Sequence, residues 1–558
     1  MTSLRTGTAV AAAALCAPNL AYACGGFFCN NMPVDQAAER IVFAYDEAAG
    51  QVETHVQITY QGEAEDFAWV VPVPAAPEIF LTTDALFDSL GAFTPALWYP
   101  SYDTEGVCDD GSYWFAPEDE VSYSSSANGG YYGVTVLASD VVGPYETVTL
   151  EATSADGLIA WLEANDYDLP DNLDPLLVPY VAAGGVFVAL RLQNGFDAGD
   201  ISPLGFRYPG TRPAVPIQLT AVAATPDMRL EVFVIGPNRA VPESYLHLIV
   251  NDAIIDWTTN GSNYNDVITR AADEAGGHGF ATDYAGPSAD WLWAFPSSFN
   301  LDGLEDQDDP VAWMDRVISS GIPASDTLLG VLRNHIPMPA DLVADGVDEN
   351  SFYNCLACYD ESLVGQPFDP VAATADLIEF VAEPSIHAHN LLAEHPWLTR
   401  MTSSLSPAEM TVDPTFVFNP DLPGVEQIRT AEITTMCDTG TNWYDSIRRI
   451  ELTDGREIYL PSMAWFDDRG ITVAEWLMDT DLLGAALIEQ LGSSGAGEVI
   501  FDVNATGDDA LDALNDEVLG EAGNDAIEAE GCGCDHGRPA TGLVAGAALI
   551  ALLRRRRS

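Results

Sequence analysis

Three histidines lie close together in the segment "SIHAHNLLAEHPW", which contains His387, His389 and His395. Imidazole nitrogens are common zinc ligands, and a β-strand would place His387 and His389 on the same face. The leucines that follow favour a helix instead, on which residues two apart point in different directions. Two interpretations remain, a zinc site or ordinary surface and helix-capping histidines, and the helical pattern favours the second.

A second cluster consists of carboxylates. The segment "NLDGLEDQDDP" contains five acidic residues around one glycine, and its candidate calcium ligands are Asp302, Asp306 and Asp308. Calcium prefers several carboxylate oxygens on a flexible loop, but this spacing differs from that of an EF-hand. A solvated acidic loop is the alternative, since acids are abundant throughout the chain. The sequence demands no cofactor, and calcium is the one that it suggests.

Residues 98–132 are rich in aromatic side chains, among them Trp98, Tyr99, Tyr102 and Trp114. Exposed aromatic rings offer rigid area with a polar edge, which suits stacking on a glycan or another envelope ligand. The alternative, which we favour, is that these rings pack a long loop against the body. A disulfide from Cys108 would help to hold such a loop.

Six cysteines lie in the body of the chain, and an even number in a secreted protein indicates disulfides. Cys24 and Cys29 could close a small loop at the start of the mature chain. The pair in "NCLACY" leaves three interpretations, of which a disulfide is favoured over a redox pair or half of a zinc site. The pairing cannot be deduced from the sequence. The disulfide candidates are Cys24, Cys29, Cys108, Cys355, Cys358 and Cys437.

The charge balance excludes several chemistries. The 558 residues include 85 acids and 21 basic residues, for a formal net charge of -64, and the sequence contains no lysine. A P-loop, a pyridoxal Schiff base and a Ser-Lys dyad all need a lysine. Nucleic acid is excluded as an expected partner because its phosphates require a basic surface. No G-x-S-x-G, H-E-x-x-H or dinucleotide motif occurs, so no catalytic residue is assigned, and a dispersed triad remains open.

The two ends carry targeting signals. Residues 1–23 combine Arg5, an apolar run and the A-x-A pattern of Ala21 and Ala23, which predicts a secretory signal peptide. At the other end, residues 506–531 form an acidic spacer before residues 532–558, which hold a short apolar run and four arginines. That run is shorter than the ~20 residues that span a bilayer comfortably. We expect an extracytoplasmic protein held at the membrane by its C-terminal tail.

The tail resembles the myxobacterial-type sorting tail, in which a cysteine precedes a brief hydrophobic segment and an arginine cluster. The resemblance implies that Cys532 or Cys534 carries the anchor and that the rest of the tail is removed. A plain membrane tether is the alternative.

The body reads as an α+β fold, with an antiparallel, β-rich N-terminal half and mixed helices and hairpins in the C-terminal half. Residues 40–45, 51–60 and 65–74 predict an antiparallel meander, in which His55 lies opposite the apolar face and is exposed. Alternation at residues 291–295 predicts a core strand, and the prolines that interrupt residues 169–181 predict only short turns. We divide the body into a β-rich part, 24–250, and a mixed part, 251–505.

Several local signals mark element ends. A helical stripe runs from Tyr264 to Ala275 and is stopped by Gly276. An acid followed by proline predicts a helix start at 309–310 and at 369–370, and a capping box spans 472–475. Residues 450–460 predict a hairpin that turns at Asp454 and Gly455.

Five segments carry a family resemblance: "CGGFFC", "QAAERIVF", "HVQITYQGEAEDFAWVVPVP", "EAGGHGFATDYAG" and "SPAEMTVDPTFVFNPDLP". Together they resemble the secreted bacterial family called domain of unknown function 2330, from Cys24 to about residue 430. The resemblance implies an extracytoplasmic protein of uncharacterised activity and supplies no catalytic residues. Two hypotheses follow, an envelope protein that binds or scaffolds, and an extracytoplasmic hydrolase with a dispersed site.

Overall fold

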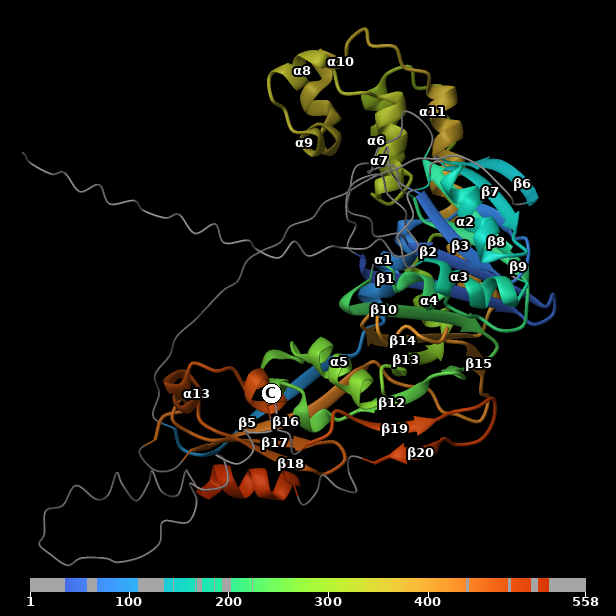
Figure 1. Cartoon of the computed structure of the whole chain (residues 1–558). Coiled ribbons are helices and arrows are strands. Elements are labelled where there is room, and N and C mark those ends of the chain that lie inside the picture. The colour runs from blue at the N-terminus through green and yellow to red at the C-terminus, as the bar shows by residue number, and fades with distance from the viewer. Residues whose placement is uncertain are drawn as a thin grey trace, which may run out of the picture.

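The fold mixes sheets and helices, which confirms the predicted α+β class (Figure 1). It is known from a computed structural model. The described residues are 36–57, 68–108, 135–143, 145–165, 167, 173–184, 186–192, 202–222, 224–437, 441–479, 483–502 and 510–520. Among them, no helix is long and apolar enough to cross a membrane.

A ten-stranded sheet forms the centre of the described part of the chain, in the order β20-β19-β12-β13-β14-β10-β1-β2-β9-β4. Two pairs, β1 with β10 and β12 with β13, are parallel, and the other neighbours are antiparallel. The sheet takes strands from both sides of residue 250. Its strands are β1 (Gln36–Asp46), β2 (Gln51–Gln57), β4 (Glu78–Leu81), β9 (Leu204–Pro209), β10 (Ala224–Gly236), β12 (Leu246–Val250), β13 (Gly279–Pro287), β14 (Trp397–Leu405), β19 (Ala486–Gln490) and β20 (Glu498–Phe501).

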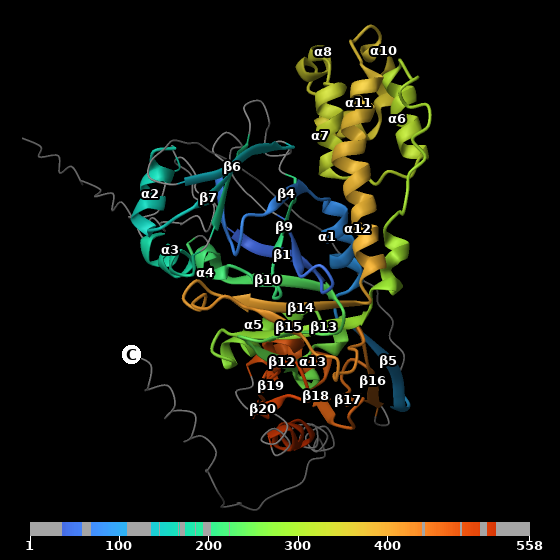
Figure 2. The same ribbon diagram turned by 90° about the vertical axis from the view of Figure 1, so that its right-hand side faces the viewer.

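Both faces of this sheet are covered in its middle. Alternate residues of β1 enter different cores, with Ile41 and Phe43 on one side and Val42 and Ala44 on the other. The second side packs against α1 (Asp84–Phe93) and α12 (Glu383–Glu394), which lie beside each other in Figure 2. A side chain opposite the first core is therefore not in solvent.

Smaller sheets flank the central one. One has the order β3-β8-β7-β6 and carries the helices α2, α3 and α4, and another has the order β18-β17-β16-β5. The pair β11-β15 completes the described sheets. The bounds are β3 (Ala68–Val73), β5 (Leu97–Gly106), β6 (Thr135–Val142), β7 (Tyr145–Glu151), β8 (Val186–Leu192), β11 (Ala240–Pro242), β15 (Phe416–Phe418), β16 (Ile428–Cys437), β17 (Arg448–Leu452), β18 (Glu457–Leu460), α2 (Ala155–Glu163), α3 (Leu173–Ala182) and α4 (Ile217–Thr220).

A helical lobe projects from the sheets and has its own core around Trp313 (Figures 1 and 2). Its last helix, α11, continues through the π-helical turn η7 (Ile378–Ala382) into α12. One continuous helical segment therefore runs from the lobe to the central sheet. The helices before η7 are α6 (Pro310–Ser319), α7 (Asp326–His335), α8 (Ala340–Ala344), α9 (Glu349–Asn354), α10 (Asp360–Leu363) and α11 (Pro370–Leu377).

The predicted element ends are confirmed. Asp309 accepts a hydrogen bond from the backbone N–H of Ala312, and Asp369 caps α11 in the same way. The capping box of Thr472 and Glu475 starts α14 (Val473–Met478), which follows α13 (Met463–Arg469). The stripe at 264–275 is α5 (Tyr264–Glu274), and the hairpin is β17-β18.

Three sequence predictions of local structure are wrong. Within the predicted strand 65–74, Ala68–Val73 form β3, but β9 occupies the edge of β2, and β3 pairs with β8 in another sheet. The segment with two prolines forms the helix α3, because burial of Leu173 and Leu177 outweighs the hydrogen bond that Pro179 removes. Residues 291–295 are not a strand, because η5 (Ser288–Ala294) is a 3-10 helix that leaves Trp293 67% exposed, although Phe295 is buried in the core as expected.

A candidate metal centre between β2 and α12

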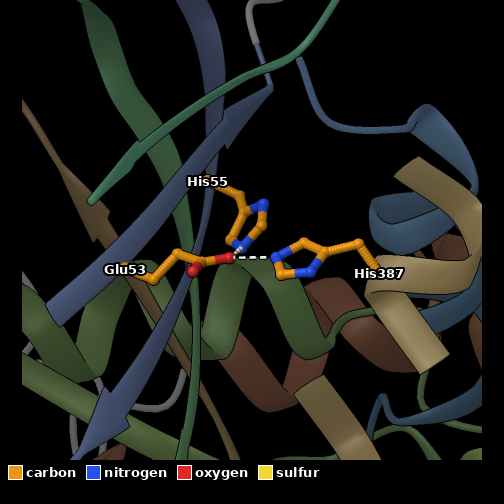
Figure 3. A group of neighbouring side chains, drawn as sticks. All are labelled: Glu53, His55 and His387. Atoms are coloured by element: carbon orange, nitrogen blue, oxygen red, sulfur yellow. Dashed lines mark hydrogen bonds and ion pairs between the residues drawn. The ribbon is translucent and has the colours of Figure 1, made fainter. Parts of the chain in front are cut away.

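Three metal-ligating side chains converge between the central sheet and α12. Glu53 and His55 lie two residues apart on β2 and therefore point to the same face, and His387 reaches them from α12 (Figure 3). One ligand atom from each residue lies within 4.8 Å of the other two. Within the described part of the chain, this is the one such group of three.

The two imidazoles meet the same carboxylate oxygen. The Nε2 atom of His55 lies 3.0 Å from Oε1 of Glu53, and Nε2 of His387 is hydrogen-bonded to that same oxygen. Although it lies close to this oxygen, the buried Nε2 of His55 has no hydrogen-bond partner. On the other side of the ring, Nδ1 of His55 lies 2.8 Å from Oγ1 of Thr82.

The second oxygen of Glu53 is held by an arginine. The Nε atom of Arg207 on β9 donates to Oε2 of Glu53 at 2.8 Å, and its Nη1 donates to Glu78 at 2.6 Å. Phe80 packs edge-on against both imidazoles, with ring centroids 5.8 Å from His55 and 5.7 Å from His387. The carboxylate is thus fixed with Oε2 on the arginine and Oε1 towards the histidines.

Burial and charge set the protonation states. His55 is fully buried, which lowers its pKa below the ordinary value, and Arg207 and His387 add to this effect against the opposing effect of Glu53. Burial alone would raise the pKa of Glu53, but the hydrogen bond with His387 and the close approach of His55 outweigh burial and hold that pKa well below its usual range. The centre therefore combines a neutral His55 with an ionised carboxylate, which are the forms that bind metal.

An open cavity of about 440 Å³ adjoins His387. Glu379 and Glu383 precede His387 by eight and four residues and line this cavity, as do Glu78 and Arg207. The carboxylates outnumber the single arginine in this wall. The approach to the metal-ligating group is therefore acidic, which favours entry of a cation.

The predicted histidine cluster separates as the helical interpretation expected. His389 bonds to the carbonyl of Phe295 at 2.9 Å, and His395 bonds to the carbonyl of Leu391 at 2.8 Å. Only His387 of the three reaches the centre. The prediction that His55 is exposed is wrong, because α12 covers that face of the sheet and leaves the side chain 0% exposed.

The candidate calcium ligands do not converge. Asp302, Asp306 and Asp308 are exposed, and none belongs to a group of three metal-ligating side chains within the described residues. The backbone carbonyl of Asp302 accepts hydrogen bonds from Arg316. This arrangement matches a solvated loop stabilised by its own contacts.

The aromatic candidates divide into buried and exposed residues. Trp98 is 4% exposed and packs on Tyr264, with ring centroids 4.6 Å apart, so it lies in the core and not on the outer surface. Tyr99 and Tyr102, which follow on β5, are 54% and 68% exposed. Trp114 lies outside the described residues.

The cysteines that the structure describes are paired. Cys108 is bonded to Cys437 across the parallel strands β5 and β16, with Cα atoms 5.2 Å apart, and Cys355 is bonded to Cys358. The remaining candidates lie outside the described residues: Cys24, Cys29, Cys532 and Cys534.

Sequence reasoning missed Glu53 as a candidate ligand and dismissed His55. The available signal was the alternation of acid and imidazole in "ETH" on a predicted strand, which places two metal-ligating groups on one face. Nothing local connects that strand to His387, which lies 334 residues away from Glu53.

Comparison with known proteins places the chain in a family. No curated protein and no solved structure matches it. A family model described as "Uncharacterized protein conserved in bacteria (DUF2330)" matches residues 18–315, more than half of the chain. The match includes Glu53 and His55 and ends before His387, and it stops short of the "SPAEMTVDPTFVFNPDLP" segment. The chain belongs to the DUF2330 family of uncharacterised bacterial proteins.

Proposed function

We propose that this chain binds one divalent transition-metal ion through Glu53, His55 and His387. The observation that carries the proposal is the convergence of two imidazole nitrogens and one carboxylate oxygen within 4.8 Å. The buried Nε2 of His55 has no hydrogen-bond partner, although buried polar atoms are nearly always paired. A cation between Nε2 and the carboxylate would satisfy both groups.

The chemistry of the ligands favours zinc. Two histidines and one glutamate form a known catalytic zinc set, with three protein ligands and one position left for water or substrate. Calcium instead takes six to eight oxygen ligands, so two imidazoles argue against it here. We therefore assign the preferred ion as Zn²⁺, with other imidazole-binding divalent ions as competitors.

The residues around the ligands would orient them. Thr82 accepts the Nδ1 proton of His55, which directs the lone pair of Nε2 towards the ion, and Arg207 holds Oε2 of Glu53 so that Oε1 faces the imidazoles. Such partners fix tautomer and orientation in metal sites, and their loss typically weakens binding 10–100-fold.

A specific observation favours metal-assisted hydrolysis as a second candidate function. The cavity of about 440 Å³ beside His387 brings Glu379 and Glu383 to the same wall as the metal ligands. A bound zinc ion would supply an activated water, and a neighbouring carboxylate is a suitable general base. This arrangement supports the hydrolase hypothesis more than a scaffold.

We further propose that the protein acts outside the cytoplasm and is held at the membrane by its C-terminal tail. The A-x-A pattern before Cys24, the acidic spacer and the arginine cluster of residues 554–557 support this location. A disulfide between Cys108 and Cys437 is compatible with an oxidising compartment.

Zinc titration by calorimetry tests the metal proposal. After dialysis against a chelator, the wild-type protein is expected to bind one zinc ion. His55→Ala and His387→Ala each remove a ligand, so their affinity for zinc is expected to be at least about 100-fold lower. His389→Ala, two residues along α12, is the matched control and is expected to bind like the wild type. Thr82→Val, which removes only the orienting hydroxyl, is expected to weaken binding about 10–100-fold.

The pH dependence has a definite direction. Protons compete for the imidazole nitrogens, so zinc affinity is expected to fall as the pH drops, and because the pKa of His55 is lowered by burial, protons compete for that ring only below the ordinary histidine value of about 6.5. Equal zinc binding by the wild type and by both His55→Ala and His387→Ala, with circular dichroism showing folded variants, would contradict the site. Equal loss in His389→Ala would do the same.

A further inference from the structure

A second cavity, which has no lining residue in common with the metal centre, lies where the central sheet meets the β5-β16 sheet. Its volume is about 330 Å³, and it is more enclosed than the cavity beside His387. Strands β12 and β13 form one wall, Trp98 of β5 and Arg429 of β16 form another, and the loop 422–425 closes a third side. The charged side chains that line it are Arg239, Arg429, Asp252 and Glu489.

The two arginines in this cavity differ from most of the arginines that the structure describes. Among the described residues, arginines generally lie within 4.0 Å of a carboxylate, as in a protein with a net charge of -64. Arg239 and Arg429 form no such ion pair within the described part of the chain. The Nε atom of each is buried and has no hydrogen-bond partner. Arg239 is only 6% exposed, so its charge is withdrawn from water.

Arg239 is held in a defined orientation. Its Nη1 donates to the carbonyl of Pro423 at 3.1 Å, and its Nη2 lies 3.4 Å from Nε2 of His247. Nδ1 of His247 donates to the carboxylate of Glu489 at 2.9 Å, so Nε2 carries the lone pair and accepts from Arg239 and from Thr282. His247 thereby orients the guanidinium of Arg239 but does not neutralise its charge.

A buried cation without a carboxylate is costly unless something else compensates it. Burial lowers the pKa of Arg239, and Glu489 opposes this effect without coming within 4.0 Å of the guanidinium. Asp252 also lines the cavity and interacts electrostatically with Arg429, but it does not come within 4.0 Å of that guanidinium to form an ion pair. The Nε–H groups of Arg239 and Arg429 are therefore suited to donate hydrogen bonds to a negatively charged acceptor.

The rest of the wall indicates the shape of that acceptor. Apolar side chains and two aromatic rings surround the arginines, among them Trp98, Tyr264, Leu248 and Ala281. A cavity of about 330 Å³ holds about ten water-sized units, since each takes ≈ 30 Å³ in the liquid. The molecule that would fit this cavity is thus small, with an oxyanion at one end and a hydrocarbon body.

We propose that this cavity binds a small organic carboxylate, with its carboxylate on Arg239 and Arg429 and its hydrocarbon part against Trp98. Guanidinium groups suit this ligand because their planar N–H donors match carboxylate geometry. The proposal is independent of the metal centre, with which this cavity shares no lining residue.

Calorimetry with hexanoate and hexanamide tests the proposal, because the two probes share a hydrocarbon chain and differ in charge. Hexanoate is expected to bind the full chain at least about tenfold more tightly than hexanamide. Arg239→Met and Arg429→Met should each remove at least about tenfold of that affinity, while methionine keeps the apolar volume. Arg212→Met is the control, since Arg212 is 59% exposed and paired with Glu243.

Three results would overturn the proposal. They are equal affinity for hexanoate and hexanamide, wild-type affinity in both cavity variants, and no saturation by hexanoate up to about 10 mM. Circular dichroism and the urea midpoint report whether each variant folds. Arg429 is less buried than Arg239, so Arg429→Met decides the question if Arg239→Met does not fold.

Discussion

Replacing Arg400 with methionine is expected to lower the free energy of unfolding by about 3–5 kcal/mol. Arg400 lies on β14 in the middle of the central sheet and is only 2% exposed. Its Nη2 lies 3.0 Å from Glu231 and its Nε lies 3.1 Å from Asp283, both buried. Removing the cation leaves Asp283 with an uncompensated charge in the core, whereas Glu231 keeps its ion pairs with Arg40 and Arg229.

The other contacts around Arg400 explain why removing its side chain is costly. Tyr264 and Thr402 donate hydrogen bonds to Asp283, and these depend on an ionised carboxylate in a fixed place. Nη1 of Arg400 also donates to the carbonyl of Gly91 at 3.0 Å, which ties α1 to the sheet. One side chain therefore joins two strands and a helix.

Urea unfolding of Arg400→Met beside Arg212→Met measures the effect. The exposed pair of Arg212 and Glu243 is expected to contribute less than about 1 kcal/mol. Adding Asp283→Asn to Arg400→Met should recover part of the loss, since the buried charge is then removed. Similar unfolding midpoints for the two single variants would show that the network does not stabilise the sheet.

Glu39→Gln is expected to stabilise the protein above neutral pH and to have little effect near pH 4.5. Burial raises the pKa of Glu39 from its ordinary value of 4.5 to about 7, although a hydrogen bond with Thr220 opposes the shift. The folded state therefore holds this proton more tightly than the unfolded state does. Stability that is present below about pH 4.5 is lost as the pH rises through about 7.

The size of this effect follows from the shift. A tenfold change in a protonation equilibrium corresponds to about 1.4 kcal/mol. The raised pKa of Glu39 therefore lowers the free energy of unfolding above pH 7 by on the order of 3 kcal/mol. Glutamine keeps the shape and the acceptor for Thr220 and never ionises. Urea midpoints of both proteins at several values between pH 4.5 and pH 8 give the difference. A difference that does not grow with pH would contradict the assignment.

Signals that join residues a few positions apart predict this fold well. The Asp309 cap, the capping box of Thr472 and Glu475, and the turn at Asp454 all stand where the sequence places them. Each depends on hydrogen bonds between close neighbours, so the local sequence contains the whole cause.

Arrangements that depend on distant segments could not be read in the same way. The polar face of β2 resembles a solvated face, because one strand does not reveal what covers it. In the fold, α12 covers that face, and Arg207 and His387 both pair with Glu53. Polar residues that satisfy each other in a core have the same sequence pattern as polar residues in water.

The central claim is that Glu53, His55 and His387 hold one metal ion, and anomalous diffraction tests it most directly. Crystals of the zinc-loaded protein would be measured on both sides of the zinc absorption edge. The account predicts an anomalous peak at about 2.0–2.2 Å from Nε2 of His55, Nε2 of His387 and an oxygen of Glu53. Zinc bound elsewhere, with these three side chains still in direct contact and no peak between them, would contradict it.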